Sequence, residues 1–152
     1  MEKTWEVKAF AQCTPDDVFD FAKLRTDVFF LEQQCSEEEL DVWDRDPRTM
    51  HLWCRADGRM VGYGRILRKD SADPEDLGVT TSIGRLVVDK EFRGQGIAGE
   101  LMARCVDTVG DQDVVLHAQD YVTGLYEQHG FVVFGEPFDE AGITHRRMVR
   151  RA

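Results

Sequence analysis

The sequence predicts a mixed α/β fold with a single β-sheet, in one domain that spans residues 1–152. Runs with strand-like alternation occur in both halves of the chain, and two longer segments carry apolar residues at helical spacing. No stretch rich in proline, glycine or serine separates the two halves. A chain of 152 residues is also long enough to bury a core without disulfides or metals.

Charge and cysteine content limit the partners and the compartment. The net charge of −10 weighs against nucleic acid or an anionic membrane as a partner, and it suits either a cationic ligand or simple solubility. The cysteines Cys13, Cys35, Cys54 and Cys105 form no C-x-x-C pair, and no apolar N-terminal segment is present. We therefore expect reduced thiols and a cytoplasmic location. No set of His, Cys and acidic residues has metal-site spacing, so we expect no metal.

The first third of the chain predicts a strand followed by a helix. "TWEVKAF", residues 4–10, alternates apolar and polar positions. Thr14 and Pro15 then mark a helix start, and the helix is expected to reach about Gln34. Its buried face is expected to hold Val18, Phe21, Leu24, Val28 and Leu31. The acidic stretch 36–47 is expected to form a short helix or an ordered loop.

The middle of the chain predicts a β meander. Two apolar runs, 50–56 and 59–67, flank Asp57-Gly58, a dipeptide typical of a two-residue hairpin turn. Residues 69–78 are expected to form a surface loop and 80–88 a third strand of this group.

The last part of the chain predicts a βαβαββ arrangement when it is counted from the strand 80–88. A helix is expected from about 96 to 110, ended by Gly110, and its buried face would hold Ile97, Leu101, Met102, Cys105 and Val109. A strand at 114–119 and a helix at 120–130, capped by Asp120 and ended by Gly130, are expected to follow. Strands at 131–134 and 143–149 would complete the sheet.

The stretch "GQGIAG", residues 94–99, has the glycine spacing of a dinucleotide-binding loop. Asp120 stands at the distance at which such loops place a ribose-binding acid. However, "DKEFR" separates the strand from Gly94, and too little chain follows to complete a doubly wound sheet. A Walker-type loop is excluded because no Gly-Lys-Ser/Thr follows.

The same stretch is suited to hold an anion. It lies at the start of a predicted helix, where unpaired N–H groups and the helix dipole attract negative charge. Gly94 and Gly96 let the backbone approach an anion closely. Arg93 offers a charge-assisted contact, unless it pairs with Glu91 or Asp89. A pyrophosphate is the ligand that matches this turn best.

At this point the sequence resembles a known family. "LVVDKEFRGQGIAGELM" is similar to the acetyl-coenzyme A signature of the GNAT superfamily of N-acetyltransferases, and "LYEQHGF" to its second motif. The two motifs cover about a third of the chain and are jointly specific. Segments such as "LRTDVFFLEQ" and "FDEAGITHRRM" extend the resemblance to the ElaA-like acetyltransferases. The acidic segment "ELDVWDRDPRTMHL" matches that subfamily less well.

The resemblance implies a mostly antiparallel, twisted mixed sheet flanked by helices, acetyl-CoA as cosubstrate, and compatibility with a homodimer. It assigns the pantetheine arm to the strand before the loop and to Gln119, and the pyrophosphate to the loop itself. The cofactor-binding residues are then Leu86, Val87, Val88, Arg93, Gly94, Gln95, Gly96, Ile97, Ala98, Gly99 and Gln119.

The resemblance also suggests catalytic roles. Tyr126 is the expected acid for the departing thiolate, with a core-packing tyrosine as the alternative. The backbone N–H of Val88 is the expected oxyanion donor. Glu32 is the expected base, because partial burial would raise its pKa; the alternative is a solvated or salt-bridged carboxylate.

Two further groups of residues are candidates for recognition or structure. Asp41, Asp44 and His51 are expected to recognise a cationic acceptor, with an acidic surface loop as the alternative. His117 and His145 lie on predicted strands and are expected to be structural.

The sequence thus predicts an N-acetyltransferase that moves an acetyl group from acetyl-CoA to a small-molecule or peptide amine. Direct attack by a primary amine in a ternary complex is expected, without an acetyl-cysteine intermediate. A non-catalytic acyl-CoA-binding regulatory module is the main alternative, and a nicotinamide-dependent oxidoreductase is a remote one.

Overall fold

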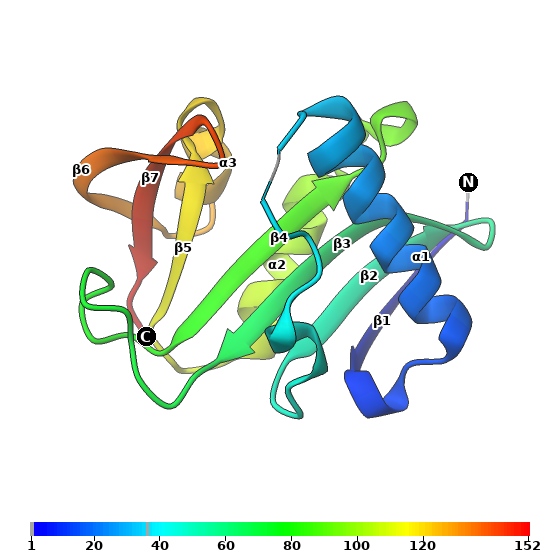
Figure 1. Cartoon of the computed structure of the whole chain (residues 1–152), viewed down its shortest axis with the longest axis horizontal. Helices are drawn as coiled ribbons and strands as arrows, with labels where there is room; N and C mark the ends of the chain where they lie inside the picture. Colours follow the sequence, from blue (N-terminus) through cyan, green and yellow to red (C-terminus); the bar gives the residue numbers. More distant parts are fainter. Residues whose placement is uncertain (1, 36) are drawn as a thin grey trace.

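The computed structural model describes residues 2–35 and 37–152, whose strands form one seven-stranded sheet (Figure 1). The strands are β1 (Lys3–Ala9), β2 (Met50–Ala56), β3 (Arg59–Arg68), β4 (Thr81–Val88), β5 (Val114–Gln119), β6 (Val132–Glu140) and β7 (Ile143–Arg150). Their order across the sheet is β1-β2-β3-β4-β5-β7-β6, and β4 pairs with β5 in parallel while the other neighbours are antiparallel. The predicted mixed, mostly antiparallel sheet is confirmed.

Helices cover both faces of the sheet. In Figure 1, α1 (Pro15–Arg25) lies in front of the strands and α2 (Ile97–Val109) lies behind them. The predicted face of α2 is buried against the strands, with Ile97, Leu101, Met102, Cys105 and Val109 all in the core. On the other face, Phe21, Leu24 and Val28 pack with Trp53 and Tyr63. Burial of these two apolar faces is the main force that holds the layers together.

The first helix begins as predicted but ends in a different geometry. The Thr14 hydroxyl accepts a hydrogen bond from the Asp17 N–H at 3.0 Å, and the Asp17 carboxylate accepts one from the Thr14 N–H at 2.9 Å. After Arg25 the chain continues as a π-helical segment, Thr26–Glu32. At its end the Gln33 N–H donates to the Val28 carbonyl, five residues back, at 2.9 Å. The wider turn rotates the end of this segment relative to an α-helix of the same length.

The remaining elements agree with the sequence-based predictions except in three places. The hairpin turn at Asp57 and Gly58 has positive φ at both residues, as predicted. The prediction of an Asp120 cap is wrong: α3 (Thr123–Glu127) follows a 3-10 turn, and its first residue has no side-chain cap. The helix is also shorter than the predicted span. The strand β6 is longer than predicted, because an irregularity between Phe134 and Phe138 lets pairing resume beyond it.

The centre of the sheet opens between β4 and β5. These strands share one pair, Ser82 with Val115, and then diverge toward their C-terminal ends (Figure 1). A bulge in β4 accompanies the divergence: Arg65 pairs with Gly84 and Tyr63 with Val87, so β4 carries one extra residue there. Arg85, inside the bulge, has φ of 53°. In the part of the chain that the structure describes, no helix is long and apolar enough to cross a membrane.

Candidate active site

A cavity of about 750 Å³ opens where β4 and β5 diverge. Its walls come from both strands, the loop before α2, the start of α2, α3 and the π-helical segment. Most of the sequence-predicted site residues line it: Glu32, Leu86, Val87, Val88, Arg93, Gly94, Gly96, Ile97, Ala98, Gly99, Gln119 and Tyr126. The structure therefore brings all of the expected cofactor residues except Gln95, and both expected catalytic side chains, to one cavity.

The loop before α2 forms one end of this cavity. Gly94 and Gly96 have φ of 78° and 81°, a left-handed conformation that glycine adopts without strain. A Cβ atom added at either glycine would meet no protein atom within 4 Å. The first hydrogen bond of the helix joins the Glu100 N–H to the Gly96 carbonyl at 3.1 Å, so the N–H groups of residues 97–99 have no partner within the helix. This end of the cavity suits a pyrophosphate, which the exposed backbone N–H groups would bind.

Gln95 is exposed in the same loop and is not part of the cavity wall. Its place between two glycines with positive φ makes it a spacer. Its role as a cofactor contact stays a prediction.

Arg93 joins the rim of the cavity to Glu32. Its two terminal nitrogens donate to the Glu32 carboxylate at 2.5 and 2.8 Å, and its Nε donates to the Val88 carbonyl at 3.1 Å. The hydrogen bonds from Arg93 lower the pKa of Glu32 and outweigh the opposing effect of burial. The expectation that burial raises the pKa of Glu32 is therefore wrong. The predicted partners of Arg93, Asp89 and Glu91, instead accept hydrogen bonds from Arg59.

Tyr126 lies deeper in the cavity. It packs edge-on against Phe131, with ring centroids 6.4 Å apart, and against the core beneath α2. Burial raises the pKa of Tyr126 to about 12. The phenol therefore stays protonated at neutral pH, in the state that a proton donor requires.

The backbone of Val88 offers the cavity an amide. The Asp89 N–H donates to the Val61 carbonyl at 2.8 Å, which makes these residues a hydrogen-bonded pair of the antiparallel ladder. Such pairs alternate, so the next pair, Gly62 with Val88, has its amides turned outward. The N–H of Val88 thus points away from β3, toward the side on which β5 diverges.

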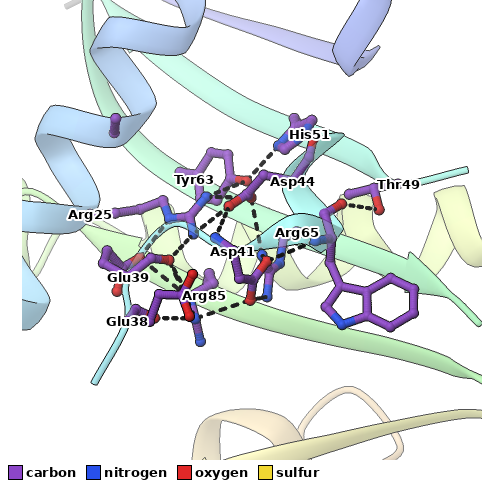
Figure 2. A network of polar contacts seen from close by, with 12 residues as sticks. Arg25, Glu38, Glu39, Asp41, Asp44, Thr49, His51, Tyr63, Arg65 and Arg85 are labelled. Carbon is purple, nitrogen blue, oxygen red and sulfur yellow. Dashed lines mark hydrogen bonds and ion pairs between the residues drawn. The ribbon is translucent and has the colours of Figure 1, made fainter. Parts of the chain in front are cut away.

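Asp41, Asp44 and His51 lie outside the cavity, within a buried network of polar contacts (Figure 2). Arg25 is fully buried and donates to Asp44 at 2.7 Å and to Glu39 at 2.6 Å. Burial opposes ionisation of Asp44, but the hydrogen bonds and charges of the arginines outweigh it and bring the pKa to about 2.

The rest of this network uses the other two predicted residues. Arg65 donates to Asp41 at 2.7 Å and to Asp44 at 3.0 Å. The imidazole of His51 contacts the Tyr63 hydroxyl at 2.6 Å. Because these side chains are occupied by neighbours, the geometry does not support direct acceptor recognition by Asp41, Asp44 and His51, which stays a prediction.

The network positions a different set of acidic residues. The Arg85 guanidinium donates to the backbone carbonyls of Glu38 at 3.2 Å and of Glu39 at 3.3 Å (Figure 2). It thereby holds the segment that contains Glu37, Glu38 and Glu39 over the sheet, and all three residues line the cavity. These three residues, which lie just before Asp41 in the same acidic stretch, were not singled out from the sequence.

Sequence reasoning also missed the wall opposite this segment. His117, Glu140 and His145 line the cavity from β5, β6 and β7. The two histidines were expected to be structural, and Glu140 was not singled out. The alternation of strand residues indicates that His117 and Gln119 share a face, which is the one signal in the sequence that links His117 to the cofactor strand. Within residues 2–35 and 37–152, no group of three or more His, Cys, Asp or Glu has metal-binding geometry.

Comparisons with known proteins identify the family of this chain. Residues 11–152 match the family model described as an acetyltransferase (GNAT) domain. A UPF0039 protein of Mycobacterium tuberculosis is 35% identical over 134 residues, which cover 88% of this chain and 83% of that protein.

Two solved structures are similar over nearly the whole chain. An acyl-CoA N-acyltransferase from Pseudomonas aeruginosa has a TM-score of 0.86 and 33% identity, with 98% of this chain and 99% of that one covered. Escherichia coli ElaA has a TM-score of 0.89 and 27% identity, with 99% of this chain and 100% of that one covered. The glycine loop at the start of α2, the opened sheet and these likenesses together place the chain in the GNAT family of acyl-CoA-dependent acyltransferases, among the relatives of ElaA.

Proposed function

We propose that residues 1–152 act as one catalytic domain that transfers the acetyl group of acetyl-CoA to a primary amine by direct attack. The observation that carries the proposal is a single cavity that joins the anion-binding loop, the divergent strands, Tyr126 and an acidic wall. The pyrophosphate would bind residues 93–99, and the pantetheine arm would run between β4 and β5 beside Gln119. This direction places the thioester near Tyr126.

The chemistry follows from the groups around that point. The neutral amine attacks the thioester carbon, and the N–H of Val88 stabilises the oxygen as it gains negative charge. The carbon–sulfur bond then breaks, and the Tyr126 phenol donates its proton to the departing thiolate. The nitrogen loses one proton to solvent as the amide forms, and Tyr126 is reprotonated from solvent. Because both substrates occupy one cavity, no acetyl-cysteine is needed.

The acceptor proposed is a small molecule or a peptide whose amine is cationic in solution. Glu37 and Glu38 line the cavity, and the net charge of −10 attracts cations over a longer range. We also propose a cytoplasmic location, which the free thiols of all four cysteines support. A homodimer remains a proposal from the family resemblance.

The test measures free thiol released from acetyl-CoA with a panel of primary amines, for the native chain and for Tyr126→Phe. We expect amine-dependent release that falls by about 10²–10⁴-fold in kcat for Tyr126→Phe, because general acid catalysis contributes that range. Binding of acetyl-CoA should stay within a few-fold of the native value. Tight binding without release for any amine would instead favour a non-catalytic acyl-CoA-binding module.

A further inference from the structure

A chain of hydrogen-bonding side chains lines the cavity on the sheet face that lies away from α2. The two ring nitrogens of His117 lie 3.2 Å from Glu140 and 3.2 Å from Asp76. The other oxygen of Glu140 lies 3.6 Å from Nε2 of His145. Four residues from three strands and one loop are thus connected, and the chain ends at His145 in the cavity wall.

The positions of the protons follow from the partners. A neutral imidazole carries one N–H, but both nitrogens of His117 face carboxylates, which only accept hydrogen bonds. Both contacts are satisfied only when His117 is an imidazolium. The hydrogen bond to Glu140 raises the pKa of His117 and outweighs the opposing effect of burial. His117 in turn lowers the pKa of Glu140, which keeps that carboxylate ionised.

His145 has different partners. Its Nδ1 lies 2.7 Å from the Ile143 carbonyl, which only accepts, so Nδ1 carries the proton of the neutral ring. Nε2 therefore keeps a free lone pair, and that lone pair faces the Glu140 carboxylate. Two acceptors that face each other favour a proton between them, because the imidazolium formed would be paired at both nitrogens.

The position of His145 suits a base on the acceptor side of the thioester. His145 pairs with Gln119 across β5 and β7, so both side chains lie on the same face of the sheet. Gln119 itself donates to Gln33 at 3.0 Å, at the end of the π-helical segment. Tyr126 enters the cavity from the other face, where it packs against the core beneath α2. The acid and the base thus approach the cavity from opposite sides, as attack and departure at one carbonyl require.

On the basis of the acyl transfer proposed above, we propose that Nε2 of His145 is the general base that deprotonates the acceptor ammonium, and that Glu140 and His117 position and stabilise it. The ammonium transfers one proton to Nε2 of His145, and the resulting imidazolium donates to Glu140. The amine lone pair then attacks the thioester carbon, the carbon–sulfur bond breaks, and the thiolate takes the Tyr126 proton. The attacking nitrogen loses its second proton to solvent as the amide forms, and the Tyr126 phenolate regains a proton from solvent. His145 later releases its proton to solvent. Glu32, held by Arg93, takes no part in this step.

Charged and titratable groups around the base set its pH dependence. Glu140 faces the ring of His145 directly. The groups linked to His145 through Glu140 and His117, from the neighbouring strands and the covering loop, are Asp76, Arg85, His117 and Arg147. Glu140 contacts the ring directly, so its charge has the largest effect.

The experiment is a pH–rate profile of kcat/KM for acetyl-CoA turnover with the best primary amine of the panel. The variants are His145→Gln, Glu140→Gln and, as a matched control, His129→Gln, whose histidine lies outside the cavity wall. We expect His145→Gln to lower kcat/KM by about 10²–10⁴-fold at neutral pH and to lose the acid limb of the native profile. The rate of His145→Gln should instead rise with pH, because the fraction of the acceptor that is neutral amine increases. Acetyl-CoA binding should stay near the native value.

Each variant answers a different objection. Glu140 is half-exposed, so Glu140→Gln should fold even if His145→Gln does not, and it should lower the rate and shift the acid limb toward a different pH. Added imidazole should restore turnover to His145→Ala, which a purely structural role would not allow. A native acid limb in both His145→Gln and Glu140→Gln would overturn the assignment while leaving the acyltransferase intact. Absence of thiol release by the native chain with every amine would overturn the proposed function, and the base with it.

Discussion

Glu32 and His145 show how direct neighbours decide the chemistry of a residue. Both line the same cavity, and a carboxylate at the end of an apolar helix face is a reasonable base in the sequence alone. In the structure Arg93 holds Glu32 with two hydrogen bonds and lowers its pKa. His145 faces the Ile143 carbonyl with Nδ1, so Nε2 carries the lone pair of the neutral ring. No pattern in the sequence encodes the partner of Glu32, because Arg93 lies 61 residues away.

Replacing Glu32 tests this distinction at the residue level. We expect Glu32→Gln to keep the acid limb of the pH–rate profile and to change kcat/KM by about fivefold or less, since a partly exposed ion pair contributes roughly 0–1 kcal/mol. The profile is measured beside that of His145→Gln under the same conditions. Loss of the acid limb in Glu32→Gln alone would restore Glu32 as the base.

At the level of elements, the sequence predicted those whose signals are local. The apolar period of α2, the Thr14 cap and the Asp57-Gly58 turn each depend on neighbouring residues, and each is confirmed. The π-helical segment was not predicted, because the apolar spacing of 26–32 does not distinguish it from an α-helix. The β4 bulge has no local signal either, since Arg85 adopts positive φ only where the strand must part from its neighbour.

The start of α2 gives a prediction at this level. Alanine at position 96 must adopt φ near 81°, which costs about 1–2 kcal/mol, and its Cβ would occupy space that the pyrophosphate needs. We expect Gly96→Ala to lower the melting temperature and to weaken acetyl-CoA binding severalfold or more. Scanning calorimetry measures the melting temperature, and titration calorimetry measures the affinity for acetyl-CoA.

The other end of the same helix provides the control. Gly110 also has positive φ, at 75°, and a Cβ there would likewise meet no atom within 4 Å. Gly110 does not line the cavity. Gly110→Ala should therefore destabilise the fold at least as much and leave the affinity for acetyl-CoA unchanged. Equal affinities of the two variants would refute the anion-binding role of Gly96.

For the whole molecule, the glycine-loop end of the cavity was far easier to predict than its other walls. The loop 93–99 is one continuous motif, and all but one of its residues line the cavity. The other walls are assembled from β4, β5, β6, β7 and the segment 37–39. These parts meet only because β7 lies between β5 and β6 and because Arg85 holds the acidic segment.

The buried network that holds this acidic segment gives a prediction for global stability. The pKa of Asp44 is about 2 in the folded state, below its ordinary 3.8. Its contribution to stability is therefore complete above pH about 4 and is lost as the pH falls toward 2. We expect Asp44→Asn to lower the free energy of unfolding by about 1.5–3 kcal/mol at neutral pH, because Arg25 and Arg65 lose charge-assisted hydrogen bonds to Asp44 while each keeps a second carboxylate partner.

The pH dependence separates this effect from a general loss of stability. The difference in melting temperature between native and Asp44→Asn chains should narrow from pH 4 to pH 2. Asp27→Asn removes an exposed carboxylate paired with Lys23 at 2.7 Å and serves as the control, with an expected change of about 0–1 kcal/mol. If the difference in melting temperature between the native and Asp44→Asn chains stayed constant from pH 4 to pH 2, that result would contradict the assigned pKa of Asp44.

The central claim is that acyl-CoA and an amine meet in the cavity between β4 and β5 and that the acyl group passes directly between them. The most direct test is mass spectrometry of a rapidly quenched reaction, which counts acetylated amine, free thiol and acetylated protein. We predict one acetylated amine for each thiol released and no acetyl group on any cysteine at any time. Thiol release without amine, or an acetylated protein that forms and decays as product appears, would contradict the account.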